Sequence, residues 1–272
     1  MQVDFVKMEG AGNDFIMLDG RNTPLPEKDF SGFAARCGDR KRGIGSDGLL
    51  VLLPAGQQGF DFTMRFFNPD GSEAEMCGNG ARCISLFAHN LGITGKKMRF
   101  STNAGPVSAE ITKAGVKLHM PSAPAITNVP GLDVAGKKLD VFFTNTGVPH
   151  AVVVMDDLDN VDIKTLGSAI RYHNRFKPAG TNANFIKSAG GNKIILRTYE
   201  RGVEDETLAC GTGACASALV ASKVFGMKSP VSVLTRGNDT LVIYFKQAKD
   251  GSFPEVFLEG PAREVFRGTV PW

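Results

Sequence analysis

Two copies of the pattern Cys-Gly-x-Gly-Ala constrain the fold of this chain more than any other feature. The copies are "EMCGNGARC" at 75–83 and "LACGTGACA" at 208–216, and their leading cysteines, Cys77 and Cys210, are 133 residues apart. Each copy follows a polar stretch and precedes an apolar, alanine-rich one, as at the start of a helix. A repeat of this kind predicts two similar halves.

Further matches in the same order along the chain indicate a duplication. At an offset of 137 residues, "GAGNDFIMLD" (10–19) aligns with "GVPHAVVVMD" (147–156). At the same offset, "GIGSDGLLV" (43–51) aligns with "GTNANFIKS" (180–188). We therefore expect an α/β (α+β) protein of two pseudosymmetric domains, each an antiparallel-rich sheet wrapped around a central helix.

Periodicity predicts short strands between a few helices. The predicted strands are 3–8, 14–19, 48–54, 61–68, 97–105, 115–121, 151–157, 183–188, 193–200, 232–237 and 241–246. The predicted helices are 28–40, 78–91, 161–171 and 211–225. The proline-rich stretch 120–131 is the expected crossover between the halves. We expect one domain at 1–121 plus 263–272 and the other at 122–262, although periodicity alone does not show whether the last ten residues return to the first half.

Composition argues against several functional classes. The net charge is +3, and the one compact basic run, 39–43, is interpreted as a solvated loop, so no nucleic-acid partner is expected. The N-terminus lacks the pattern of a signal peptide, and no apolar run reaches the ~18 residues of a membrane span, so no membrane partner is expected. Five cysteines without disulfide-scaffold density are expected to be reduced thiols of a cytoplasmic protein.

Cys77 and Cys210 have the surroundings that a reactive thiol needs. If each begins a helix, unpaired backbone N–H groups and the helix dipole lower the thiol pKa and bind an anion. Two such sites facing one carbon could remove a proton from one face and supply a proton to the other, which inverts a stereocentre. The spacing does not match a metal site or a phosphate-binding loop, so no metal is expected. Cys83 and Cys215 are interpreted as small core residues.

These motifs resemble the diaminopimelate epimerase family, which interconverts LL- and meso-diaminopimelate. The resemblance runs nearly end to end through "GAGNDF", "GIGSDGLL", "FFNPDGSEAEMCGNGARC", "GVPHAVV", "NANF" and "YERGVEDETLACGTGACA". It implies two pseudosymmetric domains, a mechanism with two bases and no cofactor, diaminopimelate as the small-molecule substrate, and a homodimer. It also implies a role in lysine and peptidoglycan-precursor biosynthesis.

The resemblance also implies roles for particular residues. Cys77 and Cys210 match the two acid/base residues. Gly78, Asn79, Gly211 and Thr212 match the helix N-termini that hold the α-carboxylate, and His150 and Glu200 match residues that tune the thiols. The far end of the substrate is assigned to Asn13, Asn68, Asn182, Glu200 and Arg201.

Simpler interpretations compete with these roles. Each asparagine is by itself a turn or cap residue, Arg201 a surface ion-pair partner and His150 a core histidine. Glu73 and Glu206, which also align in the repeat, are expected to be carboxylates at the helix entry rather than catalysts.

Two departures from some family members bear on the substrate. Val148 stands where those members have asparagine, and Gly48 stands where some have glutamine, so two hydrogen-bonding groups are missing near the expected distal site. The alternatives are a racemase of another amino acid, such as histidine, and a non-catalytic carboxylate-binding or thiol redox protein.

Overall fold

The computed structural model describes all 272 residues, which form two compact units. Unit 1 comprises Met1–Leu118 and Gly260–Trp272, and unit 2 comprises His119–Glu259. None of the four α-helices has the length and apolar character needed to cross a membrane.

Unit 1 contains two α-helices and one sheet. Its elements are β1 (Gln2–Gly10), β2 (Asn13–Asp19), the 3₁₀ turn η1 (Glu27–Asp29), α1 (Phe30–Gly38), β3 (Gly48–Leu53), β4 (Phe62–Phe67), β5 (Glu73–Ala74), α2 (Gly78–Asn90), β6 (Lys97–Thr102), β7 (Gly105–Ile111), β8 (Val116–Met120) and β18 (Arg263–Pro271). β8 begins in unit 1 and continues into unit 2.

The strands of unit 1 pair mostly antiparallel. β2 pairs with β3 and β4 pairs with β6 in parallel, while the pairs β18–β1, β1–β2, β3–β4, β4–β5, β6–β7 and β7–β8 are antiparallel. The two parallel pairs are joined by the crossovers that contain α1 and α2, as parallel strands require.

β3 shows why this sheet carries helices on both faces. All six of its residues are buried. Leu49, Val51 and Leu53 pack in one core cluster with the α1 residues Phe30 and Phe33. Leu50 points to the other face, where a Cβ added at Gly80 of α2 would lie 3.1 Å from its Cδ1. A continuous apolar run, rather than an alternating one, is the expected signature of such a strand.

Unit 2 repeats the plan of unit 1. Its elements are β9 (Thr127–Val134), β10 (Lys137–Asn145), β11 (Pro149–Val154), α3 (Ile163–Arg171), the 3₁₀ turn η2 (Asn174–Phe176), β12 (Asn182–Ser188), β13 (Lys193–Glu200), β14 (Asp205–Thr207), α4 (Gly211–Val224), β15 (Val231–Leu234), β16 (Thr240–Lys246) and β17 (Glu255–Gly260). β11–β12 and β13–β15 are parallel, and the pairs β9–β10, β10–β11, β12–β13, β13–β14, β15–β16 and β16–β17 are antiparallel.

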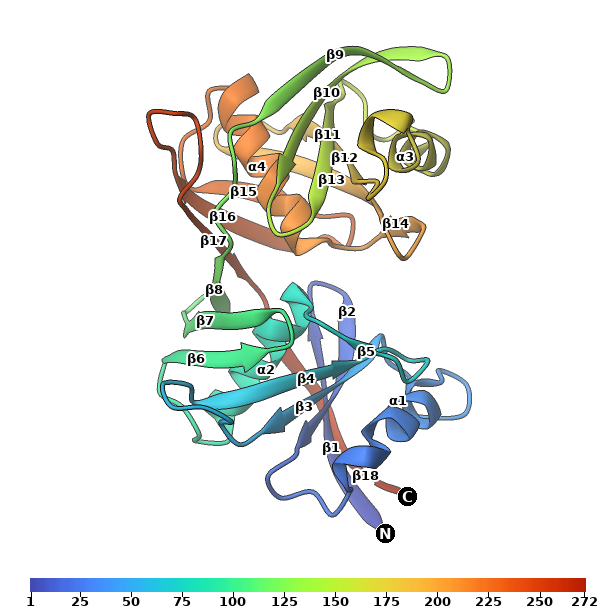
Figure 1. Ribbon diagram of the computed structural model, residues 1–272, viewed down its shortest axis with the longest axis vertical. Helices are drawn as coiled ribbons and strands as arrows, with labels where there is room; N and C mark the ends of the chain where they lie inside the picture. The colour runs from blue at the N-terminus through green and yellow to red at the C-terminus, as the bar shows by residue number, and fades with distance from the viewer. The chain divides into compact units, whose positions relative to one another are not determined.

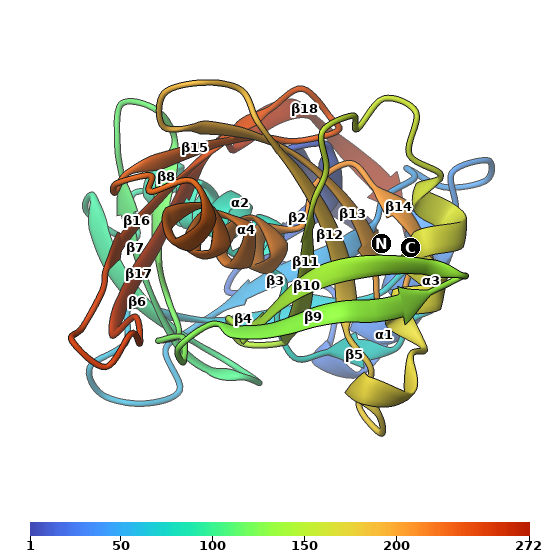
Figure 2. The same cartoon turned by 90° about the horizontal axis from the view of Figure 1, so that it is seen from above.

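α4 is the central helix of unit 2. Ten of its fourteen residues are buried, and most of those are glycine, alanine, serine or cysteine. Figure 2 shows α4 running between β15 and β16 on one side and β11, β12 and β13 on the other, and it packs on all of them. Small side chains let the strands approach this helix closely on nearly every side.

The duplication predicted from the cysteine motifs is present in the order and direction of the strands. β1 to β8 with α1 and α2 match β10 to β17 with α3 and α4. One strand breaks the chain order: β9 precedes its half, whereas its counterpart β18 comes from the end of the chain and pairs with β1. Figure 1 shows both termini together in unit 1, where the Met1 amino group donates to the Trp272 carbonyl oxygen at 2.5 Å.

The four predicted helices and eleven predicted strands are present. Seven strands were not predicted: β5, β7, β9, β10, β14, β17 and β18. The stretch 120–131 follows the boundary between the two units, as expected of a crossover, and its last residues also form the start of β9, which begins at Thr127 and pairs with β10. Most residues of β9 are exposed, so it lacks the apolar alternation that marks a half-buried strand.

Candidate active site

Cys77 stands directly before α2, as predicted. It is the N-cap residue with extended backbone angles (φ −135°, ψ 124°), and its side chain makes no capping hydrogen bond to the helix. Helices usually place a capping oxygen there, which occupies one of the free N–H groups. At α2 the Cys77 side chain does not take this role, and the N-terminal turn that begins at Gly78 has the backbone geometry that can bind an anion.

The side chain of Asn13 connects this thiol with the strands. The Cys77 Sγ donates to Asn13 Oδ1 at 3.6 Å, and Asn79 Nδ2 donates to the same oxygen at 3.3 Å. Asn13 Nδ2 in turn donates to Asp47 Oδ2 at 2.7 Å. Because the carboxylate can only accept, the Asn13 oxygen is fixed toward the thiol.

An ionic network holds this end of unit 1. Arg40 bonds both Asp14 and Asp47 at 2.7 Å, and Lys7 pairs with Asp14 at 2.8 Å. Burial would raise the pKa of Asp14, but the hydrogen bonds and charges of Arg40 and Lys7 lower that pKa to about 2. Both carboxylates are thus held in one geometry beside Asn13.

The buried guanidinium of Arg82 supports the first turn of α2 from inside the unit. Its Nη2 donates to Asn79 Oδ1 at 3.0 Å, and its Nε donates to the Pro261 carbonyl oxygen at 3.1 Å. Asn79 is therefore fixed at both ends of its amide, toward Asn13 and toward Arg82.

Asn68 lies in the turn after β4 and serves that turn. Its Nδ2 donates to Ser72 Oγ at 3.0 Å, and its backbone pairs with Ser72 and Gly71. The structure thus shows the turn role for Asn68, while Asn13 and Asn79 are the residues joined to Cys77.

Cys210 repeats the arrangement at α4. It is the N-cap residue (φ −121°, ψ 112°), without a capping hydrogen bond from its side chain to the helix. Its Sγ lies 3.6 Å from Thr212 Oγ1. The Thr146 hydroxyl donates to the Thr212 carbonyl oxygen at 2.8 Å and ties the first turn of α4 to the β10–β11 turn.

His150 aligns with Asn13 in the repeat and is fully buried. Its Nδ1 lies 3.1 Å from Asn184 Nδ2, and its Nε2 has no hydrogen-bond partner. Burial, and secondarily the charge of Arg201, lowers the imidazole pKa to about 3. His150 is therefore neutral at physiological pH.

Asn182, Glu200 and Arg201 form a second group at the same edge of the sheet. Asn182 Nδ2 donates to the Pro149 carbonyl oxygen at 3.0 Å, and its Oδ1 accepts from the Arg201 backbone N–H at 2.8 Å. Arg201 Nη1 donates to the Ala179 carbonyl oxygen. Burial raises the pKa of Glu200, against the lowering effect of the hydroxyl of Thr207, which donates to it at 2.9 Å.

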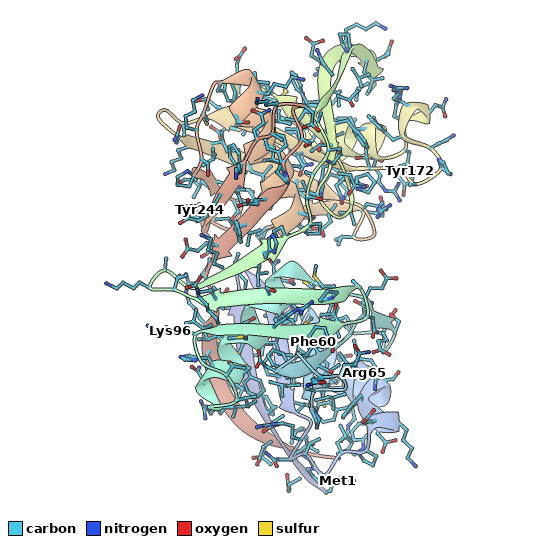
Figure 3. All side chains as sticks on the ribbon, turned by 60° about the vertical axis from the view of Figure 1, so that its left-hand side comes forward. Met1, Phe60, Arg65, Lys96, Tyr172 and Tyr244 are labelled. Carbon is cyan, nitrogen blue, oxygen red and sulfur yellow. The ribbon has the colours of Figure 1, made fainter.

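Glu73 and Glu206 are not at the helix entries, contrary to expectation. They lie in β5 and β14, where each receives two hydrogen bonds of 2.7–2.8 Å from the arginine of a neighbouring strand, Arg65 or Arg197. Arg65 is labelled in Figure 3. These matched ion pairs clamp the short strand that leads into each cysteine motif.

The other cysteines lie in the core, as predicted. Cys83 and Cys215 are fully buried, and burial raises the pKa of the Cys83 thiol. All five cysteines are free thiols. Only Cys77 and Cys210 stand at helix N-termini.

The ring of Phe66 fills the space next to Gly48. A Cβ at position 48 would lie 2.4 Å from Phe66 Cε2 and 2.8 Å from the Phe67 carbonyl oxygen. A glutamine would not fit there without displacing β4. Val148 is half-buried in the turn before β11.

The sequence motifs alone did not identify Asp47 and Asn184 as the residues that hold Asn13 and His150. Asp47 and Asn184 lie within quoted motifs, and the offset of 137 residues pairs them as it pairs Asn13 with His150. Following that offset column by column would have identified both.

Solved structures with a similar fold define the class of protein. A phenazine biosynthesis protein of the PhzF family from Bacillus anthracis has a TM-score of 0.75 at 14% identity, with 100% of both chains covered. A hydroxyproline epimerase from Agrobacterium vitis has a TM-score of 0.66 at 15% identity, covering 99% of this chain and 92% of that one. This chain therefore has the two-domain α+β fold of these proteins.

The relatives in sequence are closer. The diaminopimelate epimerase family matches residues 5–125 and 142–265. The diaminopimelate epimerase of Aquifex aeolicus is 43% identical, with 98% of each chain covered, and that of Chlorobaculum tepidum is 41% identical over 97% of this chain and 99% of its own. The chain belongs to the diaminopimelate epimerase family, a family of isomerases, which confirms the resemblance seen in the motifs.

Proposed function

We propose that this protein interconverts LL-2,6-diaminopimelate and meso-2,6-diaminopimelate by proton transfer at Cα. One thiolate removes the proton from one face of the carbon, and the other thiol delivers a proton to the opposite face. The observation that carries the proposal is the presence of a cysteine at the N-cap of the central helix in each half, at Cys77 and Cys210.

The helix N-termini supply the electrostatics of this reaction. Removing a Cα proton places negative charge next to the carboxylate, and backbone N–H groups at a helix N-terminus, together with the helix dipole, stabilise such charge. In this proposal Gly78 with Asn79, and Gly211 with Thr212, present these groups to the α-carboxylate. The same N-termini favour the thiolate over the thiol.

The far end of the substrate is assigned to the polar residues at the strand edges. Arg201 would bind the distal carboxylate, because a guanidinium can form two parallel hydrogen bonds to it. Glu200, Asn182, Asn13 and Asn68 would bind the remaining distal groups. The backbone bond from Arg201 to the Asn182 side chain supports their assignment to one subsite.

The two thiols account for both proton transfers, so we propose that the reaction needs neither pyridoxal phosphate nor a metal. Activity should survive chelators and carbonyl reagents such as hydroxylamine. Loss of activity on prolonged dialysis against EDTA, restored by a metal, would contradict this part of the proposal.

We also propose a cytoplasmic homodimer. Five free thiols suit a reducing compartment. Val265 and Phe266 of β18 are 55% and 46% exposed, and burial against a second copy of unit 1 would remove this apolar surface from water. Sedimentation equilibrium should give twice the mass of 29.1 kDa for the wild type and a lower mass for Val265→Lys.

Exchange in D₂O tests the reaction itself. Incubation with LL- or meso-diaminopimelate should place one deuterium at Cα of the inverted product, read by mass spectrometry. Histidine and other amino acids without a distal carboxylate should not exchange. Exchange of free histidine at a higher kcat/KM would favour the racemase alternative, and absence of exchange from every substrate would refute the proposal.

A further inference from the structure

Asn184 fixes its own amide orientation without help from the histidine. Its Nδ2 donates to the Ala151 carbonyl oxygen at 3.0 Å, and a carbonyl oxygen can only accept. Its Oδ1 accepts from the Thr198 hydroxyl at 3.1 Å. Asn184, Ala151 and Thr198 are all buried, and Asn184 is 0% exposed. A flipped amide would set its oxygen against the Ala151 carbonyl.

This orientation determines where the proton of His150 resides. Asn184 Nδ2 has a second hydrogen, and His150 Nδ1 lies 3.1 Å from that nitrogen. Nδ1 must therefore be the acceptor, and a neutral ring then carries its single proton on Nε2. That N–H is a fully buried donor without an acceptor in the protein. Leaving a buried donor unpaired is unfavourable, which favours a ligand-facing role over a purely structural one.

The first half has the opposite polarity at the aligned positions. There Asp47 accepts from Asn13 Nδ2, so Asn13 turns an acceptor, Oδ1, toward the Cys77 thiol. In the second half Asn184, which aligns with Asp47, donates and leaves His150 with a free donor. The duplicated scaffold thus holds an acceptor in one half and a donor in the other.

We propose that Asn184 is a positioning residue, which holds His150 as an N–H donor at Nε2 for the thiol chemistry of the second half. The functional part of this inference rests on the proposed epimerase activity. The tautomer itself rests only on the hydrogen bonds of Asn184.

Asn184→Asp is the sharpest test, because it keeps the shape and replaces the donor with an acceptor, as in the first half. The wild type, labelled with ¹⁵N-histidine, should show His150 with hydrogen on Nε2 and none on Nδ1 at pH 7. Asn184→Asp should place hydrogen on Nδ1. The chain has four histidines, and His150→Gln identifies the relevant signals.

Asn192→Asp is the matched control. Asn192 is an exposed asparagine of unit 2 whose Nδ2 donates to the Lys228 carbonyl oxygen, so the same change of charge should leave the His150 signals as in the wild type. If Asn184→Asp does not fold, Thr198→Val provides the second variant. It removes the donor to Oδ1 but keeps the bond to Ala151, so Nε2 should stay protonated.

Measuring kcat shows whether the tautomer that Asn184 imposes on His150 matters for catalysis. Asn184→Asp should lower kcat about 10–100-fold, by analogy with the effect of changing a residue that orients a metal-ligating histidine. A proton on Nδ1 in the wild type, an unchanged tautomer in Asn184→Asp, or a changed tautomer with full kcat would each overturn the proposal. An inactive wild type would instead count against the epimerase function. The spectra would still show which ring nitrogen of His150 carries the hydrogen.

Discussion

Gly213→Ala should damage the second half more than Gly80→Ala damages the first. The two glycines occupy the third position of α4 and α2, so the repeat provides a matched pair. A Cβ at position 213 would lie 2.5 Å from Asn184 Oδ1 and 3.3 Å from Cys210 Sγ. At position 80 the nearest atom is the Leu50 Cδ1, at 3.1 Å.

The difference in stability follows from what can move. Asn184 Oδ1 would have to withdraw by 0.9 Å to reach an ordinary contact of 3.4 Å, while three hydrogen bonds hold its amide. Losing one of these buried bonds costs about 1–3 kcal/mol, and replacing glycine by alanine in a helix returns up to ~1 kcal/mol. We expect Gly213→Ala to destabilise by about 1–2 kcal/mol. Gly80→Ala should be close to neutral, because the end of a leucine side chain can rotate.

Thermal unfolding followed by circular dichroism measures this difference. At roughly 2–4 °C per kcal/mol for a chain of this size, the midpoint of Gly213→Ala should lie about 2–8 °C below that of Gly80→Ala. Epimerase activity of Gly213→Ala should also fall, since the new methyl group contacts the Cys210 sulfur. Equal midpoints for the two variants would show that Asn184 can move aside without the loss of stability that its three hydrogen bonds imply.

Three further predictions concern the thiols, the histidine and the packing of β3. Cys77→Ala and Cys210→Ala should each lower the rate of Cα deuterium exchange by ~10²–10⁴-fold or more, because one face of the carbon loses its proton carrier. Cys83→Ser should keep most activity. If Cys83→Ser is equally damaging with folding intact, the assignment of the catalytic cysteines is wrong. His150 has its pKa lowered from 6.5 to about 3, so the unfolded chain binds a proton between these values that the native protein does not. The free energy of unfolding therefore carries no cost from His150 above pH 6.5 and falls by up to ~1.4 kcal/mol per pH unit as the pH drops toward 3. Urea titrations of His150→Gln should show a flatter fall of this free energy with decreasing pH. Gly48→Ala should cost about 1–3 kcal/mol in urea unfolding, because its Cβ would lie 2.8 Å from a backbone oxygen of β4, and a stability equal to that of the wild type would contradict this packing.

Much of the fold was predictable because local patterns specify it. The helices follow from composition and apolar spacing, and the N-cap positions of Cys77 and Cys210 follow from the switch between a glycine-rich and an alanine-rich segment. β9 and β18 were missed because they are mostly exposed and depend on pairing with a distant strand.

The site was only partly predictable for a similar reason. The motifs identify side chains with chemical potential, but hydrogen bonds between β2 and the loop before β3, or between β11 and β12, depend on register. Asn13 and His150 could be chosen from motifs. Their partners Asp47 and Asn184 became apparent once the strands placed them side by side.

The return of β18 to β1 affects how the protein is made on the ribosome. Unit 2 is one continuous segment, so all its strands are available soon after β17 is translated. Unit 1 must wait, because β18 is separated from β8 by the whole of unit 2. At synthesis rates of ~5–20 residues per second, the 141 residues of His119–Glu259 take about 7–28 seconds, during which the edge of β1 that later receives β18 is open. The half that begins first is thus completed last, and the nascent chain carries an unpaired strand edge for seconds while its second half folds.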